Sequence, residues 1–288
     1  MLAETQDEVY FNRMKSSIGD KAHMVPYLKQ GKVLDIGSGG GEFAALLNEA
    51  GYEVTGLDGS REAVNHSTNL GVQTIEGYTH QIDELIPPLV FDSITCSSII
   101  HEIYSYGRGV DGTECTIESV EYSLNQFRHV LKDDGVLIIR DGIMPADWDM
   151  PVEIVMKDPE GIRLAEKYLN MIPFRGTGIR KVDLQLKAGT DNILVGDMES
   201  AMEFLYTYTW GEVNYPREAQ ELYGLFTLTE YVQFLETHGF EVTHAEEYIQ
   251  TGYPANLMEK AYIQAGNKRL PYPNSNCLIV AKKKVHHD

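Results

Sequence analysis

The sequence predicts an α/β protein built on a doubly wound, mostly parallel sheet of seven strands, with a mostly helical segment inserted into it. Short apolar runs alternate with stretches of helical periodicity over the first half of the chain, a rhythm typical of right-handed βαβ units. About 85 residues, 142–226, then interrupt this rhythm. A chain of 288 residues is long enough to bury a large core and carry such an insertion.

Five short apolar runs are predicted to be buried parallel strands: 32–37, 52–58, 72–77, 91–99 and 136–143. Helices are predicted over residues 1–30 and between the strands, at 42–51, 61–71 and 119–135. In the helix that follows the first strand, Phe43, Leu46 and Leu47 recur with helical spacing, and Gly51 marks its end.

Glycines fill the turn between the first strand and its helix, in the stretch "VLDIGSGGGEF". A turn of this kind lets the backbone approach a ligand closely, and the N-terminus of the helix offers free N–H groups. Asp58 ends the second strand about 20 residues later, where a carboxylate can accept hydrogen bonds from two ribose hydroxyls. The sequence therefore predicts a ligand that contains a nucleoside.

The spacing of the glycines narrows the class of ligand. A dinucleotide-binding fingerprint, G-x-G-x-x-G, that starts at Gly37 would need a third glycine where Glu42 stands. This disfavours a nicotinamide-dependent oxidoreductase. The better match is an acidic residue followed by alternating glycines, which is given by Asp35, Gly37, Gly39 and Gly41.

With this pattern the chain resembles the class I S-adenosylmethionine (SAM)-dependent methyltransferases. Their fourth strand is similar to "FDSITCSSIIHE", and the turn and strand that follow are similar to "HVLKDDGVLIIRD". Residues 227–248 look like a helix, a turn and the sixth strand, and 275–284 like the seventh, which in this family inserts antiparallel beside the fifth. The resemblance implies a Rossmann-like methyltransferase fold, SAM as the cofactor and methyl transfer as the reaction.

The resemblance also implies which residues contact the cofactor. The acid and glycines of the turn would lie under the methionine portion of SAM, and Asp58 would hold the ribose. Ser97, at the end of the fourth strand, is a further expected contact. The family often places an acid after its third strand to hold the adenine, but here Tyr78 stands at that position. Either Thr79, His80 or a backbone group would then hold the adenine, or Tyr78 would pack against it.

The methyl group of SAM is already electrophilic, so the protein must align a nucleophile and exclude water. An alcohol, phenol or protonated amine would also need a base. The candidates are His101, Glu102 and Asp141, which lie where the fourth and fifth strands end. The alternative is catalysis by proximity alone, with these side chains shaping the pocket.

An acceptor pocket could be walled by aromatic side chains, with cation–π contacts available to an amine. The candidates are Tyr104, Tyr106, Tyr208 and Trp210, although aromatic residues at this density are also typical of a core. Arg175, Arg180 and Lys181 could hold an anionic group, or form a solvated loop. No metal is expected, because the cysteines show no ligand spacing.

The chain is accordingly divided into three parts. Residues 1–30 are expected to form N-terminal helices over the cofactor site, and 31–141 with 227–284 form the SAM-binding core. Residues 142–226 are expected to form a mostly helical cap, which 249–274 could join, because helical spacing recurs at 159–172 and 198–210. Since the insertion starts at the ligand edge of the sheet, it could fold over the cofactor and determine the choice of acceptor.

The formal net charge of −19 argues against duplex nucleic acid as a partner. No apolar run approaches the ~18 residues of a membrane span, and the polar N-terminus is not a signal peptide, so a cytoplasmic location is expected. A homodimer is compatible with the sequence. We expect a methyltransferase acting on an O or N atom of a small-molecule acceptor. The alternatives are a methyltransferase acting on tRNA or protein, and a SAM-binding protein without catalysis.

Overall fold

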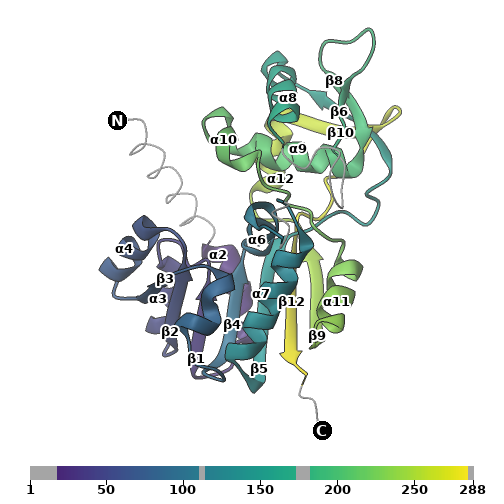
Figure 1. Ribbon diagram of the computed structural model, residues 1–288. Helices are drawn as coiled ribbons and strands as arrows, with labels where there is room; N and C mark the ends of the chain where they lie inside the picture. Colours follow the sequence, from purple (N-terminus) through teal and green to yellow (C-terminus); the bar gives the residue numbers. More distant parts are fainter. Residues whose placement is uncertain (1–17, 110–113, 173–181, 285–288) are drawn as a thin grey trace.

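The computed structural model describes residues 18–109, 114–172 and 182–284. Two parts are visible in Figure 1: a layered α/β core and a smaller part that sits at one end of its sheet. The core comes from both ends of the described chain, and the smaller part comes mainly from the middle.

The core contains a seven-stranded sheet with the order β3-β2-β1-β4-β5-β12-β9. The strands are β1 (Lys32–Ile36), β2 (Glu53–Asp58), β3 (Gln73–Glu76), β4 (Phe91–Ser97), β5 (Leu131–Gly142), β9 (Phe240–Tyr248) and β12 (Asn276–Lys283). The first five are parallel, and β12 runs antiparallel between β5 and β9. The predicted seven-stranded sheet, with its last strand beside the fifth, is therefore confirmed.

Helices cover both faces of this sheet (Figure 1). They are α2 (Ile18–Lys21), η1 (Ala22–Tyr27), α3 (Glu42–Glu49), α4 (Arg61–Asn69), η2 (Thr79–Gln81), α5 (Ile82–Leu85), α6 (Ile100–Tyr106), α7 (Ile117–Val130) and α11 (Leu228–Thr237). Because both faces are covered, the residues of β5 alternate between two apolar cores: Leu137 and Ile139 face one, and Val136 and Ile138 face the other.

The N-terminal caps explain where several helices begin. The side chain of Ser60 accepts a hydrogen bond from the backbone N–H of Ala63 at the start of α4. Thr227 and Glu230 form a capping box at the start of α11, in which each side chain accepts from the other residue's backbone N–H. Caps of this kind satisfy donors that the first turn of a helix leaves unpaired.

The smaller part is built on a five-stranded antiparallel sheet with the order β11-β10-β6-β8-β7. Its strands are β6 (Pro151–Met156), β7 (Gln185–Leu186), β8 (Ile193–Asp197), β10 (Ala261–Ala265) and β11 (Lys268–Arg269). Its helices are α8 (Pro159–Met171), α9 (Met198–Trp210), η3 (Glu212–Asn214), α10 (Tyr215–Glu218) and α12 (Tyr253–Lys260).

The insertion was predicted to be mostly helical, and it also contains a sheet that the sequence did not indicate. The two predicted helices are present as α8 and α9, but β6 precedes α8, and β7 and β8 lie between the two helices. β6 ("PVEIVM") pairs with β8 and also with β10, which comes from the 249–274 segment. Val152, Ile154 and Met156 of β6 and Leu194 of β8 bury one face of the sheet against α8 and α9, which a helical reading of the insertion overlooked.

No helix in the described ranges combines the length and apolar composition that crossing a membrane requires.

Candidate active site

A cavity of about 1730 Å³ lies where the carboxyl ends of the core strands meet the smaller part. Its wall includes Gly37, Gly39 and Asp58 from the core, and Glu221 and Tyr223 from the insertion. Pockets for one small ligand usually measure about 300–1,000 Å³. The cavity is therefore large enough for a nucleoside cofactor together with a second small molecule.

The turn after β1 needs glycine for steric reasons. Gly37 has φ +64°, and a Cβ there would lie 2.6 Å from Cδ1 of Ile99. Gly41 has φ +84°, and a Cβ there would lie 2.3 Å from Oγ of Ser67. Residues other than glycine rarely adopt this backbone conformation. Gly37 and Gly39 reach the cavity wall, whereas Gly41 lies behind it at the start of α3.

Asp58 is held at the end of β2 by two backbone donors. Its Oδ2 accepts from the N–H of Gly39 at 2.8 Å, and its Oδ1 accepts from the N–H of Ser60 at 2.8 Å. Each carboxylate oxygen can accept two hydrogen bonds, so both oxygens keep acceptor capacity toward the cavity. The side chain is thus fixed in place with room to accept from a diol.

Asp35 lies beneath the glycine turn and is not part of the cavity wall. It is 3% exposed and accepts a hydrogen bond from Oγ1 of Thr95 at 2.7 Å. Burial raises the pKa of Asp35, and the nearby ammonium of Lys21 opposes this. Asp35 therefore supports the turn from behind.

The wall also carries polar groups that fit a polar ligand. Ser97 is 6% exposed, lines the cavity, and its hydroxyl has no hydrogen-bond partner among the residues that the structure describes. Buried hydroxyls normally have a partner, so this one points to a group that the cavity would supply. Tyr78 is 58% exposed at the rim, with its ring parallel to that of His80, and Thr79 shares a hydrogen bond with Ser123.

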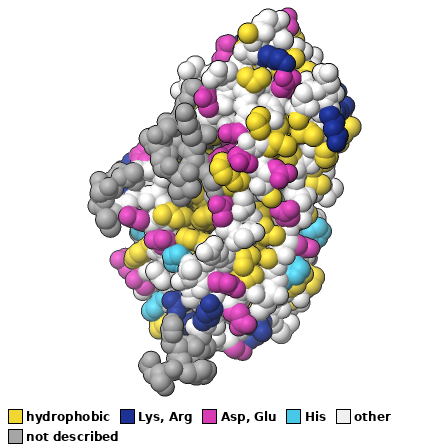
Figure 2. All heavy atoms as spheres, turned by 90° about the vertical axis from the view of Figure 1, so that its right-hand side faces the viewer, with side chains coloured by type: hydrophobic (Ala, Val, Ile, Leu, Met, Phe, Trp, Pro, Cys, Tyr) yellow, Lys and Arg dark blue, Asp and Glu magenta, His cyan; other side chains and the backbone are white. Residues whose placement is uncertain are grey.

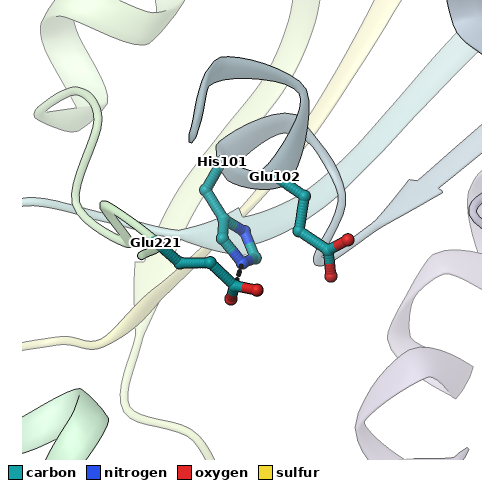
Figure 3. A group of neighbouring side chains, drawn as sticks. All are labelled: His101, Glu102 and Glu221. Atoms are coloured by element: carbon teal, nitrogen blue, oxygen red, sulfur yellow. Dashed lines mark ion pairs between the residues drawn. The ribbon is translucent and has the colours of Figure 1, made fainter. Parts of the chain in front are cut away.

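His101 is the centre of a second group of polar residues in the same cavity. It is the second residue of the short helix α6, and its Nδ1 lies 2.5 Å from Oδ1 of Asp141. The other carboxylate oxygen of Asp141 accepts from the backbone N–H groups of Ile100, at 2.7 Å, and His101, at 3.2 Å. Figure 3 shows the far edge of the ring facing Glu221, with 3.5 Å between Nε2 and Oε2.

The protonation of this cluster follows from burial and charge. Burial alone would lower the pKa of His101, but Asp141 and Glu221 outweigh it and raise the pKa of His101 well above 6.5. Burial and the charge of Glu221 raise the pKa of Glu102 to about 8. The same two causes raise the pKa of Glu218 to about 7. This cluster therefore holds several protons near neutral pH.

Sequence reasoning missed the residues that the insertion contributes. Nη2 of Arg217 lies 3.6 Å from Oε1 of Glu102, and Nε of Arg217 lies 3.7 Å from Oε1 of Glu221. Tyr106 donates to Oε1 of Glu221 at 2.9 Å, and the ring of Tyr223 lies 5.1 Å from that of His101. The stretch "PREAQELYG" contains the acids, but nothing local indicated that it would face α6.

The structure separates the expected acceptor residues into two pairs. Tyr106 and Trp210 line the cavity. Tyr104 is fully buried in the core and Tyr208 is stacked on Phe204, with 5.4 Å between ring centroids, so neither reaches the wall. Both belong to the hydrophobic core, and the ammonium of Lys260 lies 5.2 Å from the centroid of the Tyr208 ring. Arg175, Arg180 and Lys181 lie outside the described residues.

His101, Glu102 and Glu221 each offer a ligand atom, and these atoms lie within 4.8 Å of one another (Figure 3). A metal ion would need His101 in its neutral form. Asp141 and Glu221 instead favour the protonated ring, and Arg217 already lies against both glutamates. We therefore interpret the cluster as an ion-pair network.

The strand order, the glycine turn and the acid at the end of β2 together define the class of the protein: a Rossmann-like, SAM-dependent methyltransferase. A family model described as a methyltransferase domain matches residues 12–245, so the chain belongs to the methyltransferase domain family. The family, the fold and SAM as the cofactor, all expected from the sequence, are confirmed.

Known proteins agree with this assignment. An uncharacterized methyltransferase of Staphylococcus carnosus is 31% identical over 122 residues, which cover 41% of this chain and 50% of that protein. The match thus spans half the length of that relative. A SAM-dependent methyltransferase of Methanosarcina mazei has a similar fold, with a TM-score of 0.54 and 14% identity over 91% of this chain and 97% of that one. One from Archaeoglobus fulgidus gives a TM-score of 0.53 and 15% identity over 93% and 94%.

Proposed function

We propose that the chain transfers the methyl group of SAM to a nitrogen of a small basic acceptor. The observation that carries this proposal is that one cavity joins the glycine turn to a buried cluster of acids around His101. SAM supplies an electrophilic methyl group on its sulfonium. What remains for the protein is to bind the acceptor, remove its proton and exclude water.

The core wall supports the binding of the cofactor. Gly37 and Gly39 would pass along the methionine portion, and Asp58, held by two backbone donors, would accept from the ribose hydroxyls. The unpartnered hydroxyl of Ser97 offers a further contact. The adenine would lie at the rim beside Tyr78 and Thr79.

The charge of the cluster supports a cationic acceptor. Among the residues that the structure describes, four carboxyl groups, those of Glu102, Asp141, Glu218 and Glu221, lie around the cations of His101 and Arg217. Without a ligand, protons on the acids make up the difference. An ammonium group can replace those protons, and the rings of Trp210 and Tyr106 in the same wall can stabilise it further.

The same residues can make the acceptor nucleophilic. A protonated amine has no lone pair, so a base must take its proton before the nitrogen attacks the methyl carbon. Asp141 accepts from Nδ1 of His101, which leaves Nε2 facing the cavity to receive that proton. The carbon–sulfur bond then breaks and its electron pair stays on sulfur. Glu221 would stabilise the imidazolium that results.

The burial of the cluster favours a small acceptor over tRNA or protein. Glu221 is 3% exposed and His101 is 5% exposed, so the cluster lies deep in the cavity. On the face shown in Figure 2, Lys and Arg side chains occupy only a few separate spots among acidic and apolar ones. A polynucleotide would need a continuous basic surface.

The experiment is to measure the release of S-adenosylhomocysteine with amines, phenols and carboxylic acids on matched carbon skeletons. We expect turnover with amines, and a loss of about tenfold or more in kcat/KM for amines in the Glu221→Gln variant with unchanged SAM affinity. Asp58→Ala should instead weaken SAM binding, which calorimetry measures. Turnover confined to phenols or acids would contradict the proposal.

An experiment with a chelator tests whether the cluster is an ion-pair network or a metal site. If His101, Glu102 and Glu221 form an ion-pair network, preincubation with EDTA should leave turnover unchanged. Loss of turnover that Mg²⁺ or Zn²⁺ restores would show that the cluster binds a metal instead.

A further inference from the structure

Four rings form a continuous aromatic row on the wall of the cavity. They belong to His101, Tyr223, Tyr206 and Tyr253, all of which line the cavity. The ring centroids of neighbours in this row lie 5.1, 5.5 and 5.6 Å apart, with interplanar angles of 31°, 44° and 31°. Spacings of this size are typical of aromatic rings in contact. The aromatic row therefore leads without a break from His101 to the helix α12, which Tyr253 begins.

The far end of the aromatic row is fixed by the contacts of α12. The backbone N–H of Gln250, just before the helix, donates to Oγ of Ser275 at 2.9 Å. The backbone N–H of Lys157 donates to the carbonyl of Lys260, the last residue of the helix, at 2.9 Å. Leu257 is fully buried, and α12 packs against α9. In Figure 1, α12 lies on the side of the smaller part that faces the core. This end of the cavity wall is therefore held by both parts of the molecule.

The wall residues that the segment 250–256 contributes are uncharged. They include Gln250, Thr251, Tyr253 and Asn256. Asn256 comes three residues after Tyr253 and so lies on the same face of α12. Its side-chain amide makes no hydrogen bond to any residue that the structure describes, so its oxygen and its NH₂ group can both pair with a ligand. The end of the cavity at α12 thus offers hydrogen bonds without charge, whereas the end at His101 is rich in carboxylates.

We propose that the acceptor is an amine on a planar aromatic skeleton, with an uncharged hydrogen-bonding group at the end opposite the amine. The inference rests on the proposed function, which puts the amine at His101. The aromatic row would contact the flat skeleton, and Asn256 would bind the uncharged group, such as an amide or a hydroxyl. A charged group at that end would lose its water of hydration, and residues 250–256 hold no counter-ion to replace it.

The experiment measures kcat/KM of the full chain for phenylethylamines that differ only in the group para to the side chain. The groups are carboxamide, carboxylate and amidinium, which share one planar shape and differ in charge. A cyclohexane analogue of the carboxamide tests the aromatic skeleton. The carboxamide should be preferred by about tenfold or more over each charged compound, because their charge is left without a partner. It should be preferred about threefold or more over the cyclohexane analogue, the range expected of aromatic contacts.

A charged variant tests the place of Asn256 directly. Asn256→Asp adds a carboxylate at α12, so kcat/KM for the amidinium compound should rise about tenfold relative to the carboxamide. The affinity for SAM, measured by calorimetry, should stay the same. Asn267→Asp adds the same charge at an exposed position outside the cavity wall and should behave as wild type.

Two kinds of failure are distinguishable. Equal kcat/KM for the para-substituted compounds in wild type, no preference for the aromatic skeleton, or an unchanged ranking in Asn256→Asp would overturn this inference and leave the proposed function standing. If none of the amines were methylated, the proposed function would fail, and this inference with it. The comparison in wild type needs no variant, so it decides the matter even if Asn256→Asp does not fold.

Discussion

At the scale of single residues, the chemistry of His101 depends on the two carboxylates between which it lies. Oδ1 of Asp141 lies 2.5 Å from Nδ1 of His101, and the carboxylate of Asp141 is itself held by backbone N–H groups. Glu221 faces the other nitrogen at 3.5 Å. Because both charges favour the imidazolium, they raise the pH at which the neutral ring that can accept a proton forms.

We therefore expect kcat to rise with pH, with an apparent pKa well above the 6.5 that is ordinary for histidine. Glu221→Gln removes one of the charges that raise the pKa of His101, so the rising limb should move to lower pH by about one unit or more. The measurement is the pH profile of kcat with a saturating amine. Glu212→Gln, which changes an exposed acid paired with Arg163, is the matched control. Identical profiles for wild type and Glu221→Gln would remove His101 from the reaction.

The raised pKa of Glu102 leads to a second prediction, which concerns the stability of the fold. Its pKa is about 8 in the folded chain against an ordinary 4.5, so the folded state keeps a proton that the unfolded state releases. The free energy of unfolding should thus decrease as pH rises from about 4.5 to about 8, and Glu102→Gln should remove this contribution. Melting temperatures between pH 5 and 9 should fall less steeply in the variant than in wild type or in Glu84→Gln, an exposed control. Parallel curves for all three chains would contradict the assignment.

At the scale of elements, the segment that carries Glu221 is anchored on two helices of different parts. The backbone N–H of Leu222 donates to Oγ of Ser105 on α6 at 2.9 Å. The carboxylate of Glu203 on α9 accepts from the N–H groups of Tyr223, at 3.0 Å, and Gly224, at 2.6 Å. These buried bonds set where Glu221 stands relative to His101.

Loosening this anchor should affect the acceptor and not the cofactor. Ser105→Ala leaves the N–H of Leu222 without its partner and should cost about 1–3 kcal/mol of stability. The KM for the acceptor should rise severalfold while SAM affinity stays the same, as measured by steady-state kinetics and calorimetry. Thr243→Ala, which removes a bond to Val280 far from the cavity, should change neither. An unchanged acceptor KM despite lower stability would show that the anchor does not position the site.

The elements that could be predicted from the sequence are those with a local cause. The glycine turn, Asp58 and the alternating strands and helices of the core were predictable because each pattern is complete within a few residues. The sheet of the smaller part was not, because β6 pairs with β10 more than 100 residues later, as at Val155 and Tyr262. Glu221 was missed for the same reason, since only tertiary folding brings it to His101. Tyr104 and Tyr208 show the converse: an aromatic pattern alone does not separate a pocket wall from a core.

At the scale of the whole molecule, the cavity exists because two parts meet. The core supplies the turn and Asp58, and the insertion supplies Arg217, Glu218 and Glu221. The insertion is expected to determine the choice of acceptor, and this stays a proposal. The cytoplasmic location and the homodimer also stay proposals.

The net charge of −19 gives a prediction at this scale. The protein should not bind duplex DNA or RNA at physiological salt, because its net negative charge repels the phosphate backbone. A gel-shift titration with duplexes of both kinds measures this. Tight binding that weakens steeply as salt is raised would contradict the proposal of a small-molecule acceptor.

The most direct test of the central claim is a crystal structure with S-adenosylhomocysteine bound. The account predicts the homocysteine portion along Gly37 and Gly39, the ribose hydroxyls on Asp58, and the sulfur facing His101 and Glu221 across a gap that fits a small amine. Density for the ligand elsewhere, or a sulfur turned away from His101 with the insertion closed over it, would contradict the claim that this cavity is the site of methyl transfer.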